Sequence, residues 1–214
     1  MFKAVLWDFG GVMTSSPFEA FNRFEQEHGL PKDFIRSINA TNPHTNAWAQ
    51  LESAEIDVEA FDQLFADEAE AKGHTVRGQQ VLALLSGSIR PEMVKALTLI
   101  KAKLKVGCIT NNVKSVGSGA GMAKDPERTA QFAAVMDLFD TVIESSKAGI
   151  RKPDPRIYTL ACETMAITPA ETIFLDDLGI NLKPAKALGM TTIKVLDSSQ
   201  AISELETHLQ MSLR

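Results

Sequence analysis

The fold of this chain is decided by residues 3–12, KAVLWDFGGV. Their apolar run is continuous, which is typical of a strand that is covered on both faces. Asp8 ends the run, and Gly10 and Gly11 then allow the backbone to turn sharply and to approach a ligand closely. Ligands bind at the C-terminal edge of open parallel sheets, so an acid placed there is a functional candidate. An aspartate that only starts a tight turn would give the same pattern.

Four later segments have the same strand character and alternate with helical patterns. They are residues 106–109, 141–143, 173–175 and 192–195. Strands that alternate with helices predict an α/β fold with a doubly wound parallel sheet. Its crossovers are right-handed, so all the strands end at the same edge. We therefore expect Asp8, Thr110 and the pair Asp176-Asp177 to converge, which turn propensity alone does not predict.

A long helical stretch separates the first strand from the others. Residues 17–88 carry helical patterns, with helix starts expected at Ser16-Pro17 and at the N-cap Asp57. The expected organisation is an α/β core formed by residues 1–16 and 89–214. Residues 17–88 are expected to form a helical cap, inserted after the first strand and able to cover the Asp8 edge.

The composition limits the classes of function. The net charge is −5 and we find no basic stripe with interleaved aromatic residues, which argues against nucleic acid as a partner. No run approaches the ~18 apolar residues of a membrane span, and the N-terminus does not resemble a secretory signal. We therefore expect no membrane insertion and a cytoplasmic location. Oligomeric state leaves no readable signal.

Three further patterns give weaker indications. Cys108 and Cys162 lie in apolar stretches without CxxC spacing, so they are expected to be buried and reduced. The four histidines lack the spacing of metal ligands. Residues 117–121, GSGAG, lack the GxGxxG spacing of a dinucleotide site and are expected to form a loop.

Lys152 lies in residues 149–155, GIRKPDP, where two prolines stiffen the chain and Pro155 can open the next helix. Clustered carboxylates repel one another, and their pKa values rise unless a cation intervenes. A fixed lysine together with Mg²⁺ provides this cation. Because Mg²⁺ prefers carboxylates, waters and substrate oxygens as ligands, the pattern predicts a metal-assisted phosphate site.

The order of Asp8, Thr110, Lys152 and Asp176-Asp177 resembles the four motifs of the haloacid dehalogenase (HAD) superfamily, most of whose members are phosphatases. Residues 149–208 are also similar to the phosphatase domain at the N-terminus of soluble epoxide hydrolase. The resemblance covers nearly the whole chain. The helical insertion resembles a family cap only in position and helicity.

The resemblance implies a Mg²⁺-dependent hydrolase that acts on small phosphate monoesters or acyl phosphates, with a small phosphorylated metabolite as its partner. Asp8 is the implied nucleophile and forms an aspartyl-phosphate, which splits one difficult displacement into two. Thr110, Asn111 and Asn112 are the implied substrate ligands. Lys152 is implied to neutralise the charge of the phosphoryl group.

The implied ligands of Mg²⁺ are Asp8, Asp177 with Asp176 beside it, and the backbone carbonyl of Gly10. Family members with phosphatase activity usually carry a second aspartate at this glycine position, which protonates the leaving group and later activates water. Its loss predicts a slow phosphatase, or one whose substrates have good leaving groups.

Two other functions fit the same residues. The first is a non-catalytic module that binds phosphate or regulates a partner through the retained Mg²⁺ pocket. The second is a haloacid dehalogenase, which also uses an aspartate nucleophile but needs no metal. The pair Asp176-Asp177 argues against the dehalogenase.

Overall fold

A five-stranded sheet forms the centre of the computed structural model, which describes residues 1–85, 87–112 and 126–213. Its strands are β1 (Ala4–Trp7), β2 (Lys105–Thr110), β3 (Thr141–Glu144), β4 (Thr172–Asp176) and β5 (Thr191–Lys194). Neighbouring strands are parallel in the order β3-β2-β1-β4-β5, so β1 is central. This architecture confirms the predicted α/β fold with a doubly wound sheet.

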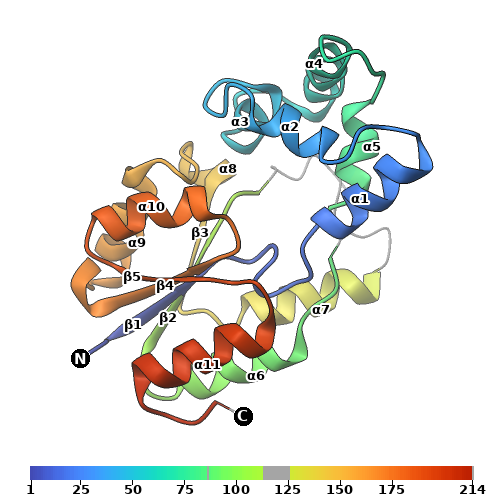
Figure 1. Ribbon diagram of the computed structural model, residues 1–214. Helices are drawn as coiled ribbons and strands as arrows, with labels where there is room; N and C mark the ends of the chain where they lie inside the picture. Colours follow the sequence, from blue (N-terminus) through green and yellow to red (C-terminus); the bar gives the residue numbers. More distant parts are fainter. Residues whose placement is uncertain (86, 113–125, 214) are drawn as a thin grey trace.

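The two faces of the sheet are covered by different helices (Figure 1). Helices α6 (Pro91–Lys101), α7 (Pro126–Met136) and α11 (Ser198–Leu209) cover one face, and α9 (Pro155–Met165) and α10 (Gly179–Ala187) cover the other. Strand β1 illustrates why both faces must be apolar: Val5 and Trp7 pack in the first layer, whereas Leu6 packs in the second. Successive side chains of a strand point to opposite faces, so a doubly covered strand requires a continuous apolar run.

In the described residues, five helices follow β1 before α6 leads the chain back to the sheet at β2. They are α1 (Phe18–Glu27), α2 (Phe34–Ala40), α3 (Ala47–Glu52), α4 (Val58–Glu70) and α5 (Gly78–Ala83). We call residues 18–85 the helical segment; one hydrophobic cluster is formed entirely by its side chains. The predicted N-cap Asp57 accepts a hydrogen bond from the N–H of Ala60 at 2.8 Å. Helix α1 begins at Phe18, after Pro17.

The helical segment lies on the side of the sheet toward which β1 points (Figure 1). The segment that leaves the sheet and the segment that returns to it run side by side, and an antiparallel bridge joins Thr14 to Ile89. The N–H of Arg90 donates to the carbonyl of Met13 at 2.9 Å beside that bridge. The division into a core of residues 1–16 and 89–214 and a cap of residues 17–88 stays a prediction.

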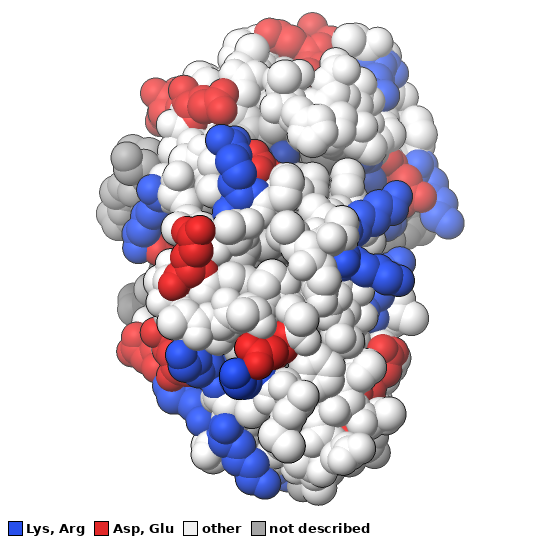
Figure 2. All heavy atoms as spheres, turned by 90° about the vertical axis from the view of Figure 1, so that its left-hand side faces the viewer, with Lys and Arg blue, Asp and Glu red and all other residues white. Residues whose placement is uncertain are grey.

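Several smaller predictions can be compared with the structure. Cys108 and Cys162 are buried and free, as predicted. Within the described residues, every helix is too short or too polar to cross a membrane. Basic and acidic side chains are interspersed on the face drawn in Figure 2. The glycine-rich residues 117–121 lie outside the described residues.

The register of the paired strands determines which residues meet at the C-terminal edge of the sheet. Trp7, the last residue of β1, pairs with Cys108 of β2 and with Leu175 of β4. Asp8 therefore leaves the sheet at the same level as Asp176, the last residue of β4. The geometry of the parallel sheet brings these two acids together although they are distant in sequence.

Candidate active site

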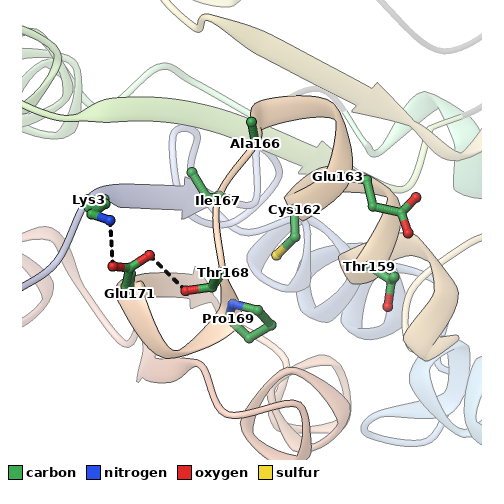
Figure 3. A pocket seen from close by; sticks show the side chains of 9 residues that line it. All are labelled: Lys3, Thr159, Cys162, Glu163, Ala166, Ile167, Thr168, Pro169 and Glu171. Atoms are coloured by element: carbon green, nitrogen blue, oxygen red, sulfur yellow. Dashed lines mark hydrogen bonds and ion pairs between the residues drawn. The ribbon is translucent and has the colours of Figure 1, made fainter.

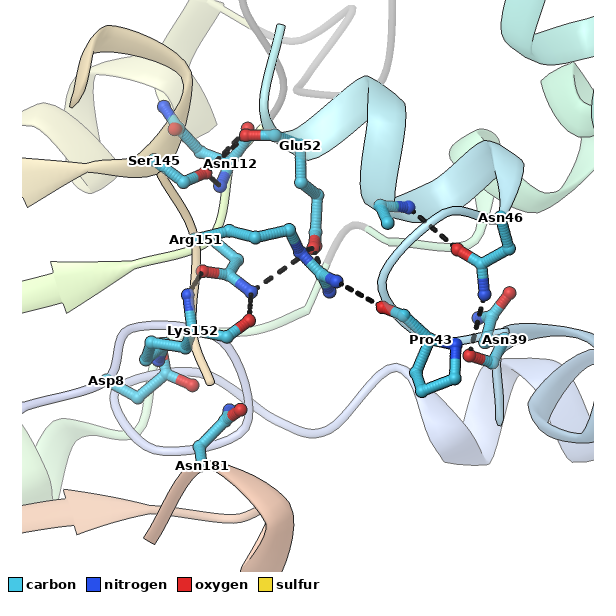
Figure 4. Close-up of polar contacts among 12 residues, drawn as sticks. Asp8, Asn39, Pro43, Asn46, Glu52, Asn112, Ser145, Arg151, Lys152 and Asn181 are labelled. Atoms are coloured by element: carbon cyan, nitrogen blue, oxygen red, sulfur yellow. Dashed lines mark hydrogen bonds and ion pairs between the residues drawn. The ribbon is translucent and has the colours of Figure 1, made fainter. Parts of the chain in front are cut away.

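Asp8 lies at the C-terminal edge of the sheet, beside Lys152 (Figure 4). Its N–H donates to the carbonyl of Leu175 at 2.8 Å, which holds the backbone against β4. Its Oδ1 accepts from the N–H of Phe9 at 2.7 Å and lies 2.7 Å from Lys152 Nζ. Among the described residues, no hydrogen bond reaches Oδ2. One carboxylate oxygen is thus held by the protein, and the other is open to a substrate or a metal.

Lys152 lies between two carboxylates although its side chain is only 1% exposed. Its Nζ is 2.7 Å from Asp8 Oδ1 and 2.8 Å from Asp176 Oδ2. Burial acts to lower the pKa of Lys152, but the charges of Asp176 and Asp8 outweigh burial and raise the pKa above its ordinary value. The ammonium group is therefore charged at neutral pH, as a group that neutralises phosphoryl oxygens must be.

Asp176 is completely buried, and other groups of the protein hold both of its carboxylate oxygens. Oδ1 accepts from the N–H of Leu178 at 2.8 Å, and Oδ2 accepts from Lys152 Nζ at the same distance. The amide of Asn181 donates to both oxygens at 3.1 Å. These bonds give Asp176 a fixed orientation, as a buried carboxylate requires.

Asp177 lies against the glycine turn that follows Asp8. Gly11 has a φ of +75°, and a Cβ atom on it would collide with the carboxylate of Asp177. Glycine is therefore needed here both for its backbone conformation and for space. Gly10 differs, because its φ lies outside the left-handed region and a Cβ atom would meet no atom of the described residues within 4 Å. Neither strain nor crowding explains the missing side chain at Gly10.

The three acids Asp8, Asp176 and Asp177 fit a divalent cation. Each offers one oxygen, and these oxygens all lie within 4.8 Å of one another. Burial raises the pKa of Asp8 well above its ordinary value; Lys152 opposes this shift, and the charges of the two neighbouring acids add to it. Burial and the charge of Asp176 raise the pKa of Asp177 to about 6. A hard cation bound by carboxylate oxygens would offset this repulsion, and Mg²⁺ prefers oxygen ligands of this kind together with waters and substrate oxygens.

Residues 110–112 form the end of β2 and the start of the loop after it, and they lie at the same edge of the sheet. Thr110 is the last residue of the strand and is buried. The amide of Asn111 bonds the backbone of Lys152 in both directions: Nδ2 donates to its carbonyl at 2.9 Å, and Oδ1 accepts from its N–H at 2.8 Å. Asn111 thus holds the lysine loop, and its predicted role as a substrate ligand stays a prediction.

Asn112 makes its contacts with the segment that follows β3. Its Nδ2 donates to Glu144 Oε1 at 2.8 Å, and its Oδ1 accepts from Ser146 Oγ at 2.9 Å. Its N–H donates to Ser145 Oγ at 3.0 Å. The side chain therefore fixes the start of helix α8 (Ser145–Ala148), while its predicted contact with substrate stays untested.

Sequence reasoning did not single out three residues near Lys152. Asn181 holds Asp176, whereas Glu52 and Arg151 form an ion pair beside Asn111. The position of Arg151 immediately before Lys152 was a usable signal. Glu52 had none, because it lies in a helical stretch without a motif.

A separate hollow of about 470 Å³ lies away from these acids (Figure 3). It contains the ion pair between Lys3 Nζ and Glu171 Oε1, which are 2.7 Å apart. Lys3 precedes β1 and Glu171 precedes β4, so the hollow lies at the opposite edge of the sheet from Asp8. The hollow is therefore not part of the site formed by Asp8, Asp176 and Asp177.

The site thus combines a parallel α/β sheet with a lysine that lies among three carboxylates at its C-terminal edge. The family model of the haloacid dehalogenase-like hydrolases matches residues 2–189, and the chain belongs to this family of hydrolases. This result confirms the family resemblance seen in the motifs.

Three curated relatives extend this assignment. The chain is 33% identical to mouse acyl-CoA dehydrogenase family member 10 over 99% of its own length, but it spans only 20% of that protein. It is 32% identical to mouse bifunctional epoxide hydrolase 2 over 95% of its length and 38% of that protein, which confirms the predicted similarity. It is 26% identical to the sesquiterpene phosphatase astK of Aspergillus oryzae over 95% of both chains.

The fold is also shared with solved structures. A HAD family enzyme of Bacteroides thetaiotaomicron, crystallised with magnesium and inorganic phosphate, superposes with a TM-score of 0.62. The match covers 96% of this chain and 99% of that one at 22% sequence identity. At this identity the match establishes the common fold.

Proposed function

We propose that this chain is a Mg²⁺-dependent phosphatase that hydrolyses small phosphate monoesters or acyl phosphates. The observation that carries the proposal is the position of Lys152 Nζ, which lies 2.7 Å from Asp8 and 2.8 Å from Asp176. Asp177 adds a third carboxylate oxygen within 4.8 Å. A nucleophile, a fixed cation and a set of metal ligands are thereby combined in one site.

In the proposed reaction, the carboxylate of Asp8 attacks phosphorus, and the bond from phosphorus to the leaving oxygen breaks. The aspartyl-phosphate that forms is then hydrolysed by water. Lys152 stabilises the negative charge of the phosphoryl oxygens in a site from which most water is excluded. Thr110 is proposed to bind the same oxygens, together with Asn111 and Asn112.

The proposed metal ligands are Asp8, Asp176, Asp177 and the carbonyl of Gly10. Bound Mg²⁺ supplies electrostatic stabilisation of the charge that develops on the transferring group. Asp176 also fixes Lys152, because its carboxylate accepts from Nζ. The absence of a side chain on Gly10 leaves no positioned acid at that place, so substrates with good leaving groups are expected to react faster.

Two similarities support phosphate esters as the substrate class. The relative from Aspergillus oryzae is named as a phosphatase, and the match covers 95% of both proteins. The structural neighbour from Bacteroides thetaiotaomicron was crystallised with magnesium and inorganic phosphate. We also propose a cytoplasmic location, in keeping with two buried and free cysteines.

The test is hydrolysis of p-nitrophenyl phosphate and acetyl phosphate, with Mg²⁺ and after chelation of the metal. We expect turnover only with the metal, and its loss in Asp8→Asn. Asp62→Asn is the matched control, because it neutralises a buried carboxylate of the helical segment. Activity that persists after chelation would refute the metal requirement. A folded protein that binds phosphate but never turns over either substrate would favour the non-catalytic module.

A further inference from the structure

Glu52 is the last residue of α3, but its carboxylate makes its contacts with the loop that carries Lys152 (Figure 4). Its Oε2 accepts from Arg151 Nε at 2.7 Å and lies 2.5 Å from Arg151 Nη2. The same oxygen accepts from Asn111 Nδ2 at 3.2 Å. The carboxylate of Glu52 therefore contacts both Arg151, which precedes Lys152, and Asn111, which bonds the backbone of Lys152.

The two partners of Glu52 restrain the backbone of Lys152 from both sides. Asn111 bonds the carbonyl and the N–H of Lys152, as described above. Arg151 is the preceding residue, and its Nη1 donates to the carbonyl of Pro43 at 2.9 Å. The peptide on each side of Lys152 is thus tied to the helical segment through Glu52 or Pro43.

The ion pair between Glu52 and Arg151 is largely buried, so water screens its attraction less than that of a surface ion pair. Glu52 is 7% exposed, and the side chain of Arg151 is 19% exposed. Oε2 of Glu52 makes all of these contacts, and separating a largely buried ion pair is costly because it leaves a desolvated charge without its partner. The carbonyl of Glu52 also accepts from Ser145 Oγ at 2.7 Å, which fixes the end of α3 against α8.

We propose that Glu52 is a positioning residue of the active site. Through Asn111 and Arg151 it holds the backbone of Lys152, so that the ammonium group stays between Asp8 and Asp176. The placement of the catalytic lysine consequently depends on the placement of helix α3. The proposal rests on the proposed function in that it treats Lys152 as a catalytic group.

The first test is the kinetics of Glu52→Gln with p-nitrophenyl phosphate and Mg²⁺. Because a displacement of about 1 Å can cost up to ~100-fold in rate, we expect kcat to fall about 10- to 100-fold, with a smaller change in KM. Arg151→Lys is the second variant. It keeps the charge but lacks the paired N–H donors, so kcat is expected to fall in the same way.

Asp62→Asn is again the matched control. Asp62 is a buried carboxylate of the helical segment that pairs with Arg77 and accepts from the N–H of Gln79 at 2.8 Å. Within the described part of the chain it has no hydrogen bond or ion pair with the lysine loop. Its loss is expected to lower the thermal unfolding midpoint and to leave kcat within about twofold. This control separates a loss of stability from a loss of lysine placement.

A crystal structure of Glu52→Gln supplies a measurement that does not depend on turnover. We expect Lys152 Nζ to move away from Asp8 by about 1 Å, compared with a wild-type crystal grown under the same conditions. An unmoved lysine, or a kcat equal to that of Asp62→Asn, would overturn the proposal. If the wild type hydrolyses no phosphate ester, the proposed function fails, while the lysine position still decides whether Glu52 positions it.

Discussion

Gly10→Asp is expected to add a general acid to the proposed active site. The φ of Gly10 lies outside the left-handed region, and a Cβ atom on it would meet no atom of the described part of the chain within 4 Å, so the backbone can accept a side chain without strain. The new carboxyl group joins three acids, and like charges favour its protonated form, which is the form that a general acid needs. The substitution therefore acts on the chemistry and not on the packing.

The size of the effect follows from general acid catalysis. A positioned acid contributes about 10²–10⁴-fold, equivalent to about 3–5 kcal/mol of transition-state stabilisation. We expect a smaller gain here, because no group among the described residues orients the new carboxyl group. We expect kcat/KM for an alkyl phosphate to rise about 10- to 100-fold, with little change for p-nitrophenyl phosphate, whose leaving group needs no proton.

The assay compares one aryl and one alkyl phosphate in wild type, Gly10→Asp and Gly10→Ala. The alanine variant is the matched control, because it shares the loss of backbone freedom and lacks the carboxyl group. Its free energy of unfolding is expected to rise by about 0.4–1 kcal/mol through the unfolded state. A folded Gly10→Asp protein with the aryl-to-alkyl ratio of Gly10→Ala would refute the reasoning. Leaving-group protonation would then not limit the rate, or another group would perform it.

Three further perturbations follow from the same geometry. Asp177→Asn is expected to abolish Mg²⁺-dependent turnover yet raise the thermal midpoint of the metal-free protein, because burial and Asp176 raise the pKa of Asp177 to about 6; an unchanged or lower midpoint would contradict this. Gly11→Ala is expected to lower the unfolding free energy by more than about 1 kcal/mol, since φ is +75° and Asp177 occupies the space; denaturant unfolding measures it, with Gly10→Ala as the control. Burial opposes the ionisation of Asp62, but the N–H of Gln79 and the charge of Arg77 lower its pKa below the ordinary value. Its ionised form therefore stabilises the fold above the unfolded-state pKa of about 4, and this stability is lost as the pH falls further. Urea unfolding between pH 5 and pH 3 is expected to show a shallower decline in Asp62→Asn than in wild type, and equal declines would contradict the assignment.

The parts of the site that the sequence predicts are those that follow from strand geometry. Asp8 and Asp176 both follow apolar runs, and a parallel sheet brings the ends of its strands to one edge. Their convergence with Lys152 required only the strand pattern and the motif order. The paired register of Trp7 with Leu175 is the physical cause, since it sets the two acids at one level.

Other contacts could not be predicted, because no local pattern encodes them. Glu52 meets Asn111, Ser145 and Arg151 across separations of 59, 93 and 99 residues. The helical pattern around Glu52 would be the same if its carboxylate made none of these contacts. Asn112 illustrates the same limit: an amide after a strand is a candidate ligand, but the structure shows it bonded to Ser146. The direction of a side chain in a loop depends on partners that only the folded structure brings close to it.

The charges of the site connect its structure with its proposed requirement for metal. Asp8, Asp176 and Asp177 face one ammonium group, so the four groups carry a net charge of −2 when all are ionised. A phosphate monoester is itself negative at neutral pH, and in a buried site like charges repel more strongly than in water. One divalent cation held by the three acids would bring the net charge of these groups to zero, and the site would then repel a phosphate group less. The binding of inorganic phosphate should therefore depend on Mg²⁺ even where no bond is broken.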